Sequence, residues 1–247
     1  MDKTAIIIPA RYGSSRLEGK PLLKVAGKSV IQWVYEKAQQ SKLADIIIVA
    51  TDDERIYDCV KDFGGVVEMT SVNHKCGSDR IMEVVSRHPE IGYICNLQGD
   101  EPLIKPESID AVIKNVVEDD FADISTLIRK ITPKEAENPN LVKCVTDKNG
   151  FALYFSRSKI PFERNNSIAE FYGHLGIYGY KRRALEVMTS ETQTMLEKTE
   201  SLEQLRALEN GMKIKTSVVD FVPVGIDTKE DLEKFRKIVE NRLSLNK

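Results

Sequence analysis

The chain has 247 residues, of which 41% are hydrophobic and 30% are charged, an ordinary balance for a globular protein with a sizeable core. This length fits one large α/β domain. The formal net charge is −2 and the isoelectric point is about 6.0, which argues against non-specific binding to nucleic acid or to an anionic membrane. A small anionic ligand needs only a local cluster of cations.

In the first half of the chain, apolar runs alternate with patterns of helical period. The first run, Ala5–Ile8, is too short for a signal peptide and predicts a buried strand. Asp52 or Asp53 is the expected N-cap of the second helix. Apolar strands separated by helices indicate a parallel sheet covered on both faces. Further strands are expected at 45–51, 66–69 and 93–97, and helices at 30–40, 53–63 and 78–87.

The pattern changes after Pro106. A turn signal at 148–150 predicts a hairpin between two neighbouring strands. Ser201 and Gln204 predict a capping box for a helix that runs to 210, and Thr228 with Asp231 predicts the cap of a final helix to about Leu243. Other elements are expected at 107–117 (helix) and at 124–131, 142–146, 152–156, 173–180 and 214–219 (strands). We therefore expect an α/β fold with a doubly wound, mostly parallel, Rossmann-type sheet and an antiparallel insertion in the second half.

Four cysteines occur without CxxC spacing, and no segment approaches the ~20 apolar residues of a transmembrane helix. We read these features as a reducing cytoplasm, with no structural zinc, no nucleic-acid partner and no membrane partner. The protein is then expected to act on soluble substrates.

The segment after the first strand, residues 10–20, combines small residues with cations. Ligands of open α/β sheets bind beyond the carboxyl ends of the strands. Backbone N–H groups near Gly13, Ser14 and Ser15, with the cations Arg11, Arg16 and Lys20, suit a triphosphate and a pyrophosphate leaving group. The loop is neither a Walker A motif nor a dinucleotide fingerprint, because five residues separate its glycines and Pro21 follows the lysine. A solvated basic loop is the alternative interpretation.

The string IPARYGSSRLEGKPL at 8–22 closely resembles the start of the CMP-Kdo synthetases, the 3-deoxy-manno-octulosonate cytidylyltransferases. The resemblance continues in order through nearly the whole chain. Its further blocks are VATDDERI (49–56), GSDRI (77–81), NLQGDEPL (96–103), ALYFSRSKIP (152–161), HLGIY (174–178), SLEQLRALENG (201–211) and GIDTKEDL (225–232). Seven further blocks in order make a chance resemblance negligible.

The resemblance implies a transfer of CMP from CTP to Kdo, giving CMP-Kdo and pyrophosphate for lipopolysaccharide biosynthesis. Asp100 follows a strand at the carboxyl edge of the sheet, where a carboxylate suits Mg²⁺. Its pairing with Asp227 is implied by the resemblance alone; taken singly, each would be read as a turn or helix cap. The implied catalytic residues are Arg11, Lys20, Asp100 and Asp227. Nucleotide contacts are implied for Ala10, Arg11, Gly13, Ser14, Ser15, Arg16, Lys20, Cys76, Gly77, Arg80 and Gln98.

The resemblance also implies a site for the acidic sugar, a homodimer and one domain over 1–247. Residues 1–118 would form the nucleotide-binding half and 119–247 the half for sugar binding and dimerisation, with the dimer formed around Ala152–Pro161. Sugar contacts are implied for Gln98, Arg157, Arg164, His174, Tyr178, Glu203 and Gln204. Each of these also has a structural interpretation: ion pair, loop cation, core residue, helix surface or, for Gln204, helix cap.

The chain departs from the family's pattern at Glu18, where proline is usual, at Cys76 and Ser78, where serine and threonine are common, and at Gly173, where a lysine often precedes the histidine. These departures leave the exact acceptor open, with 8-amino-Kdo or another ulosonic acid as the alternative. Sialic acid ranks lower, because its enzymes resemble this chain only in the opening loop. A catalytically silent protein of the same fold is disfavoured by the joint presence of the four catalytic candidates.

Overall fold

The computed structural model describes residues 2–13, 17–164, 169–222 and 224–245, which fall into two compact units. The first contains Met1–Ile91, Asn96–Asp110 and Pro223–Lys247, and the second contains Gly92–Cys95 and Ala111–Val222. The chain enters the second unit near the expected boundary at 118, but its C-terminal segment returns to the first. Among the described residues, no helix is long and apolar enough to cross a membrane.

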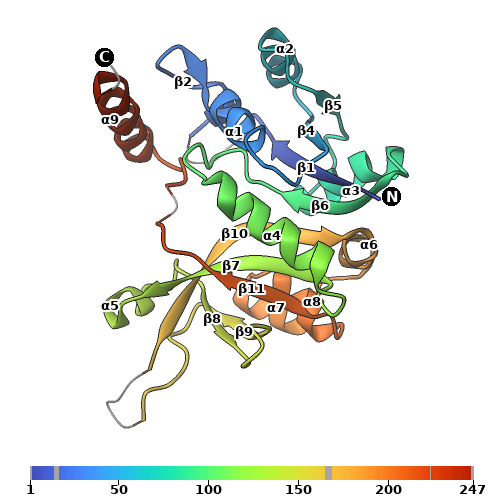
Figure 1. Ribbon diagram of the computed structural model, residues 1–247, viewed down its shortest axis with the longest axis vertical. Coiled ribbons are helices and arrows are strands. Elements are labelled where there is room, and N and C mark those ends of the chain that lie inside the picture. Colours follow the sequence, from blue (N-terminus) through green and yellow to red (C-terminus); the bar gives the residue numbers. More distant parts are fainter. Residues whose placement is uncertain (1, 14–16, 165–168, 223, 246–247) are drawn as a thin grey trace. The chain divides into compact units, whose positions relative to one another are not determined.

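A parallel ladder lies at the centre of the first unit (Figure 1). Strand β1 (Lys3–Ala10) pairs with β4 (Ile46–Thr51), and β4 pairs with β5 (Val67–Met69), in parallel throughout. The isoleucines of β1 have no exposed surface, as expected for a parallel strand covered on both faces. The predicted parallel sheet is confirmed, and its strand ends lie within a residue or two of the expected ones.

The helices of the first unit begin at the side chains that the sequence suggests. In α2 (Glu54–Asp62), the Asp53 carboxylate accepts the amide of Arg55 at 3.0 Å, so Asp53 is the N-cap. In α9 (Lys229–Leu245), the Thr228 hydroxyl and the Asp231 carboxylate bond reciprocally to each other's backbone amides at 3.2 and 3.1 Å, which confirms the predicted cap. The unit also contains α1 (Val30–Ala38) and α3 (Gly77–Arg87).

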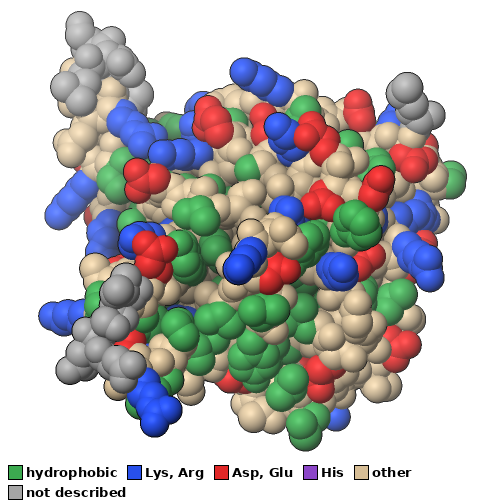
Figure 2. Space-filling view, turned by 60° about the horizontal axis from the view of Figure 1, so that its bottom comes forward, with side chains coloured by type: hydrophobic (Ala, Val, Ile, Leu, Met, Phe, Trp, Pro, Cys, Tyr) green, Lys and Arg blue, Asp and Glu red, His purple; other side chains and the backbone are tan. Residues whose placement is uncertain are grey.

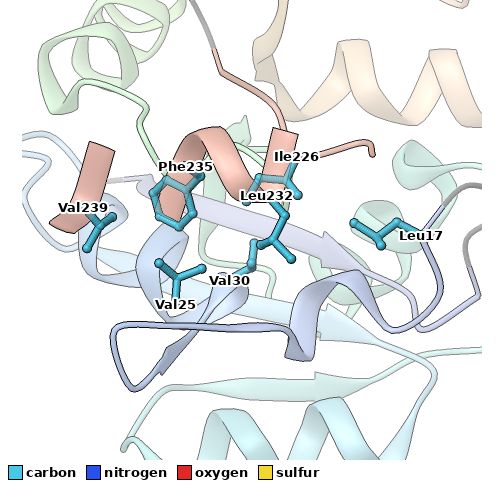
Figure 3. Close-up of a cluster of buried hydrophobic side chains, with 7 residues drawn as sticks. All are labelled: Leu17, Val25, Val30, Ile226, Leu232, Phe235 and Val239. Carbon is cyan, nitrogen blue, oxygen red and sulfur yellow. The ribbon is translucent and has the colours of Figure 1, made fainter. Parts of the chain in front are cut away.

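A buried cluster attaches α9 to the start of the chain (Figure 3). Leu232, Phe235 and Val239 of α9 pack with Val25 of β2 (Lys24–Val25) and Val30 of α1. Figure 3 shows that Leu17 and Ile226 belong to the same cluster. The 3₁₀ helix η1 (Lys20–Leu22) follows Leu17 closely, and the short strand β3 (Lys28–Ser29) completes this region. The cluster therefore fixes the loop that carries Lys20 and the segment that carries Asp227.

The second unit contains the predicted antiparallel insertion. Strand β11 (Ile214–Val218) pairs in parallel with β7 (Ile124–Ile131), whereas β10 (Phe171–Lys181) pairs with β7 in antiparallel. β8 (Lys143–Thr146) joins β10, and β9 (Ala152–Ser156) closes the predicted hairpin with β8. Gly150 takes a φ of 78° in the turn between them. β7 and β9 have the predicted bounds.

The predicted capping box of Ser201 and Gln204 is wrong. Ser201 has a left-handed φ of 52° and ends α7 (Met195–Glu200), so α8 (Gln204–Glu209) begins three residues later. The amide of Leu202 closes the end of α7 on Glu197 O at 3.2 Å. Three short helices were not predicted, α5 (Pro133–Ala136), α6 (Arg182–Ser190) and α7, because short helices carry little periodic signal. The remaining elements are β6 (Ile91–Asn96) and α4 (Pro106–Glu118).

Candidate active site

The loop after β1 is closed by a single glycine. Gly19 has a φ of 64°, and its amide donates to Tyr12 O at 3.0 Å. A Cβ at this position would lie 3.0 Å from the Tyr12 ring. Glycine is therefore required by both the backbone conformation and the close approach. Gly13 is exposed, whereas Ser14, Ser15 and Arg16, predicted to bind phosphate, lie outside the described residues.

Glu18, the acidic residue of the loop, has a cationic neighbour outside the loop. The Arg55 guanidinium lies over the Tyr12 ring, 3.3 Å from its centroid. The hydrogen bond to Asp53 is the main cause of the raised pKa of Arg55, and the charge of Glu18 adds to it. The negative charge of Glu18 is thus partly balanced by an arginine beyond the phosphate loop.

Three of the four predicted catalytic residues meet in the first unit. Lys20 Nζ lies 2.5 Å from Asp100 Oδ2 and 3.2 Å from Asp227 Oδ1. The backbones of the two carboxylate segments are also joined, because Ile226 N donates to Asp100 O at 2.9 Å. The two aspartates that the resemblance paired as metal ligands therefore share one cation. A second carboxyl lies next to them: burial and the charge of Asp100 raise the pKa of Glu101 to about 7.

Asp100 is positioned by the chain that follows β6. The amide of Leu97 donates to Ile7 O of β1 at 3.2 Å, so this chain passes beside β1 before it reaches Gln98 and Asp100. β1 itself ends at Ala10, where the phosphate loop begins. The expected meeting of the loop and the carboxylate at the carboxyl edge of the strands is confirmed.

A cavity of about 200 Å³ opens in the first unit beside the same strand end. It gathers six of the predicted nucleotide-binding residues, together with three that were not predicted, Pro9, His74 and Lys75. Its start on α3 places the positive end of a helix dipole at the wall, which favours an anionic ligand. The six predicted residues that line it are Ala10, Arg11, Cys76, Gly77, Arg80 and Gln98.

Arg80 lines the cavity as a buried, paired cation. Its side chain is 6% exposed, and Nη2 bonds Asp52 Oδ2 at 2.6 Å while Nη1 bonds the Thr70 hydroxyl. The interpretation of Asp52 as a simple helix cap is therefore wrong, since Asp53 caps α2 and Asp52 holds Arg80. The alternative of Arg80 as a surface arginine is also excluded. α3 begins at Gly77 after Cys76, whose thiol makes no capping hydrogen bond, while Ser78 is buried within the helix.

In the second unit, His174 and Tyr178 of β10 lie in an aromatic cluster with Phe155 of β9. Their ring centroids are 5.3 Å apart, and His174 lies 5.2 Å from the Phe155 ring. The register of β10 on β7 shifts between Leu175 and Tyr178, and the Thr126 hydroxyl fills this irregularity, 2.8 Å from Ile177 O. Thr126 carried no signal in the sequence that would have marked it as part of this site.

The Thr126 contact assigns the tautomer of His174. The single hydroxyl proton of Thr126 is used on a backbone carbonyl, so the hydroxyl accepts from His174 Nε2 at 3.0 Å. Burial lowers the pKa of His174 to about 3. The imidazole is therefore neutral at ordinary pH, with Nδ1 as its acceptor. Burial first, then the charges of Tyr180 and Glu203, raise the pKa of Tyr178, which keeps its hydroxyl protonated.

The other predicted sugar contacts differ in their availability. Gln204 is buried, and its Nε2 has no hydrogen-bond partner in the described part of the chain. The Arg157 guanidinium is engaged by backbone carbonyls, at 2.7 Å from Glu200 O and 3.3 Å from Ser201 O and from Pro139 O. Arg164 is exposed.

Gly173, the departure from the family's lysine, is buried in β10. A Cβ there would lie 3.0 Å from the Ile131 side chain and 3.1 Å from that of Leu141. These contacts are tighter than ordinary packing, so a larger residue requires its neighbours to move. The glycine is therefore matched to the packing of this particular chain.

Known proteins agree with this arrangement. The family model described as Cytidylyltransferase matches residues 5–214. The 3-deoxy-manno-octulosonate cytidylyltransferase of Fusobacterium nucleatum is 49% identical, over 97% of this chain and 98% of that one. That of Escherichia coli is 44% identical, with both chains covered completely. The solved structure of CMP:2-keto-3-deoxy-manno-octonic acid synthetase complexed with CTP has a TM-score of 0.94 and 42% identity, covering 98% of this chain and 100% of that one.

A more distant structure shows the fold alone. The 4-diphosphocytidyl-2C-methyl-D-erythritol synthase of Anaerococcus prevotii has a TM-score of 0.65 at 14% identity, over 97% of this chain and 96% of that one. The family match and the relatives, by contrast, extend over nearly the whole chain. On these matches and this geometry, the chain belongs to the cytidylyltransferase family, and within it to the 3-deoxy-manno-octulosonate cytidylyltransferases.

Proposed function

We propose that this protein transfers CMP from CTP to Kdo, giving CMP-Kdo and pyrophosphate, as a cytoplasmic step that supplies lipopolysaccharide biosynthesis. The anomeric hydroxyl oxygen of the sugar bonds to the α-phosphorus and loses its proton, and the bond from that phosphorus to pyrophosphate breaks. The observation that carries the proposal is the convergence of Lys20, Asp100 and Asp227 in the unit that also holds the cavity.

The catalytic cations act by positioning and by charge. Arg11 is exposed at the cavity wall, where a guanidinium can hold a phosphate through two parallel hydrogen bonds. Lys20 contributes a compact charge beside the strand end, where negative charge grows on the α-phosphate and the leaving group. We assign most of the rate enhancement to these two effects.

Asp100 and Asp227 fit a divalent ion. Two carboxylates that already share one cation form the oxygen-rich donor set that Mg²⁺ prefers, with phosphate oxygens completing it. Mg²⁺ bound there would neutralise triphosphate charge and lower the pKa of the sugar hydroxyl. The Lys20 ammonium holds the same two carboxylates, so lysine and metal ion draw on the same oxygens.

The sugar contacts follow from the hydrogen-bonding capacity of the second unit. The Nδ1 atom of neutral His174 accepts from a sugar hydroxyl, and the buried Gln204 amide donates to a carboxylate or hydroxyl oxygen. Arg157, occupied by backbone carbonyls, positions the chain around Ser201 and does not take the sugar carboxylate directly.

A homodimer completes the proposal, with the interface around Ala152–Pro161. The second unit exposes Leu153 of β9 by 62%, Phe162 by 87% and Met195 by 71%. Figure 2 shows hydrophobic side chains gathered on the face of the molecule that it displays. Sedimentation of wild type against Leu153→Lys tests this, since a monomer in both would exclude the interface.

The activity is tested by pyrophosphate release with CTP and Mg²⁺ against a panel of acceptors: Kdo, 8-amino-Kdo and sialic acid. Release with Kdo supports the proposal. Release only with the amino sugar would assign the same chemistry to the other acceptor, and no release with any acceptor would favour a silent nucleotide-binding protein. Asp100→Asn is the matched variant, and its turnover is expected to fall by orders of magnitude.

A further inference from the structure

The carboxylate of Glu83, outside the motifs of the phosphate loop, holds one wall of the cavity. It lies in α3 and accepts the backbone amide of Ser71 at 2.9 Å and the His74 ring at Nε2, 2.5 Å away. Arg87 Nη2, one turn further along the helix, forms an ion pair with its other oxygen. The side chains of His74 and Glu83 are 22% and 24% exposed. Glu83 thus ties the segment at 71–74 to the helix.

This segment and helix form the cavity wall together. His74 lines the cavity, and so does Gly77 at the start of the helix that carries Glu83. Arg80 anchors the same segment from the next turn, through the Thr70 hydroxyl. The position of His74 in the wall is therefore set by the tether to Glu83.

The tether also sets which ring nitrogen is free. Burial would raise the pKa of Glu83, but the bonds from Ser71 and His74 and the charge of Arg87 lower it overall. An ionised carboxylate can only accept, so His74 Nε2 must donate to it. In the neutral imidazole, Nδ1 is then an acceptor, and it has no hydrogen-bond partner within the described residues.

We propose that Glu83 is a positioning residue for base recognition: by holding His74 at Nε2, it presents Nδ1 as an acceptor that prefers cytosine to uracil. Cytosine carries an amino donor where uracil carries a carbonyl acceptor. An acceptor in the wall therefore pairs with the first and opposes the second. This inference rests on the proposed function, in that the cavity takes the nucleotide.

The test is calorimetric binding of CTP and of UTP, with Mg²⁺ and without sugar. We expect Glu83→Gln to weaken CTP binding about tenfold, as for loss of one hydrogen bond set by a charged group. UTP binding should change little, so the preference falls. His74→Ala should lose the same preference, and the double variant should lose no more than His74→Ala, because Glu83 acts through His74.

Glu68→Gln is the matched control. Glu68 bonds Arg87 and His88 in the same surface cluster without a bond to His74, so its CTP preference should equal that of wild type. An unchanged preference in Glu83→Gln, additive losses in the double variant, or an equal loss in Glu68→Gln would each overturn the inference. A purely structural role would weaken CTP and UTP alike. Wild type that binds no CTP would instead overturn the proposed function, and this inference with it.

Discussion

Replacing Lys20 by methionine should tighten metal binding in the absence of nucleotide while abolishing turnover. The Lys20 ammonium lies within 2.5 Å of Asp100 and 3.2 Å of Asp227, so a divalent ion must displace it from both carboxylates. Methionine keeps most of the side-chain volume and removes the charge. Turnover should fall by orders of magnitude, because the cation beside the reacting phosphate is lost.

The size of the effect on metal binding follows from the exposure of the three groups. Lys20 is 14% exposed and Asp100 29%, whereas Asp227 is 48% exposed and largely screened by solvent. A partly buried pair at this distance, discounted for that exposure, is worth about 1.5 kcal/mol, which corresponds to roughly tenfold tighter binding. Titration with Mg²⁺ by calorimetry measures it directly.

Lys24→Met is the control, because Lys24 is an exposed lysine on β2 of the same unit and removes the same charge. It should leave metal affinity near that of wild type. If Lys20→Met binds Mg²⁺ no more tightly than Lys24→Met, Lys20 does not compete with the ion and the argument fails. Near-normal turnover in Lys20→Met would refute its catalytic role separately.

Three further predictions concern the loop and the second unit. Gly19→Ala should destabilise the fold by about 1–2 kcal/mol in urea unfolding, from the left-handed φ and the contact with Tyr12; an unchanged midpoint would show that the loop relaxes freely. Thr126→Val should destabilise by about 1–3 kcal/mol and lower sugar affinity, because His174 Nε2 loses its acceptor, whereas Thr126→Ser should restore both. The pKa of His174 lies near 3 in the folded state, below the unfolded value of about 6.5, so the unfolded chain binds the extra proton and stability is lost as pH falls from 6.5 toward 3. At pH 5 this amounts to about 2 kcal/mol, and His174→Gln should lack that part of the loss; equal pH slopes in the two proteins would contradict the shift.

The local elements of this fold were largely readable from the sequence. The bounds of β7 and β9, the hairpin turn at Gly150 and the cap formed by Thr228 and Asp231 all depend on residues close together in the chain. The prediction failed at Ser201, where a serine three residues before a glutamine has the composition of a capping box. Its left-handed backbone, set by the end of α7, cannot be read from composition.

The site required the tertiary structure. The sequence by itself determined that cations follow β1 and that a carboxylate follows β6, because strand ends and loop composition are local properties. Only the fold decided that Lys20 meets Asp100 and Asp227, which lie 80 and 207 residues further along the chain. It likewise decided that Asp52 holds Arg80, that Glu83 holds His74 and that backbone carbonyls occupy Arg157. Spacing in a sequence specifies which groups share a face of one element, whereas contacts between elements depend on how their buried faces pack.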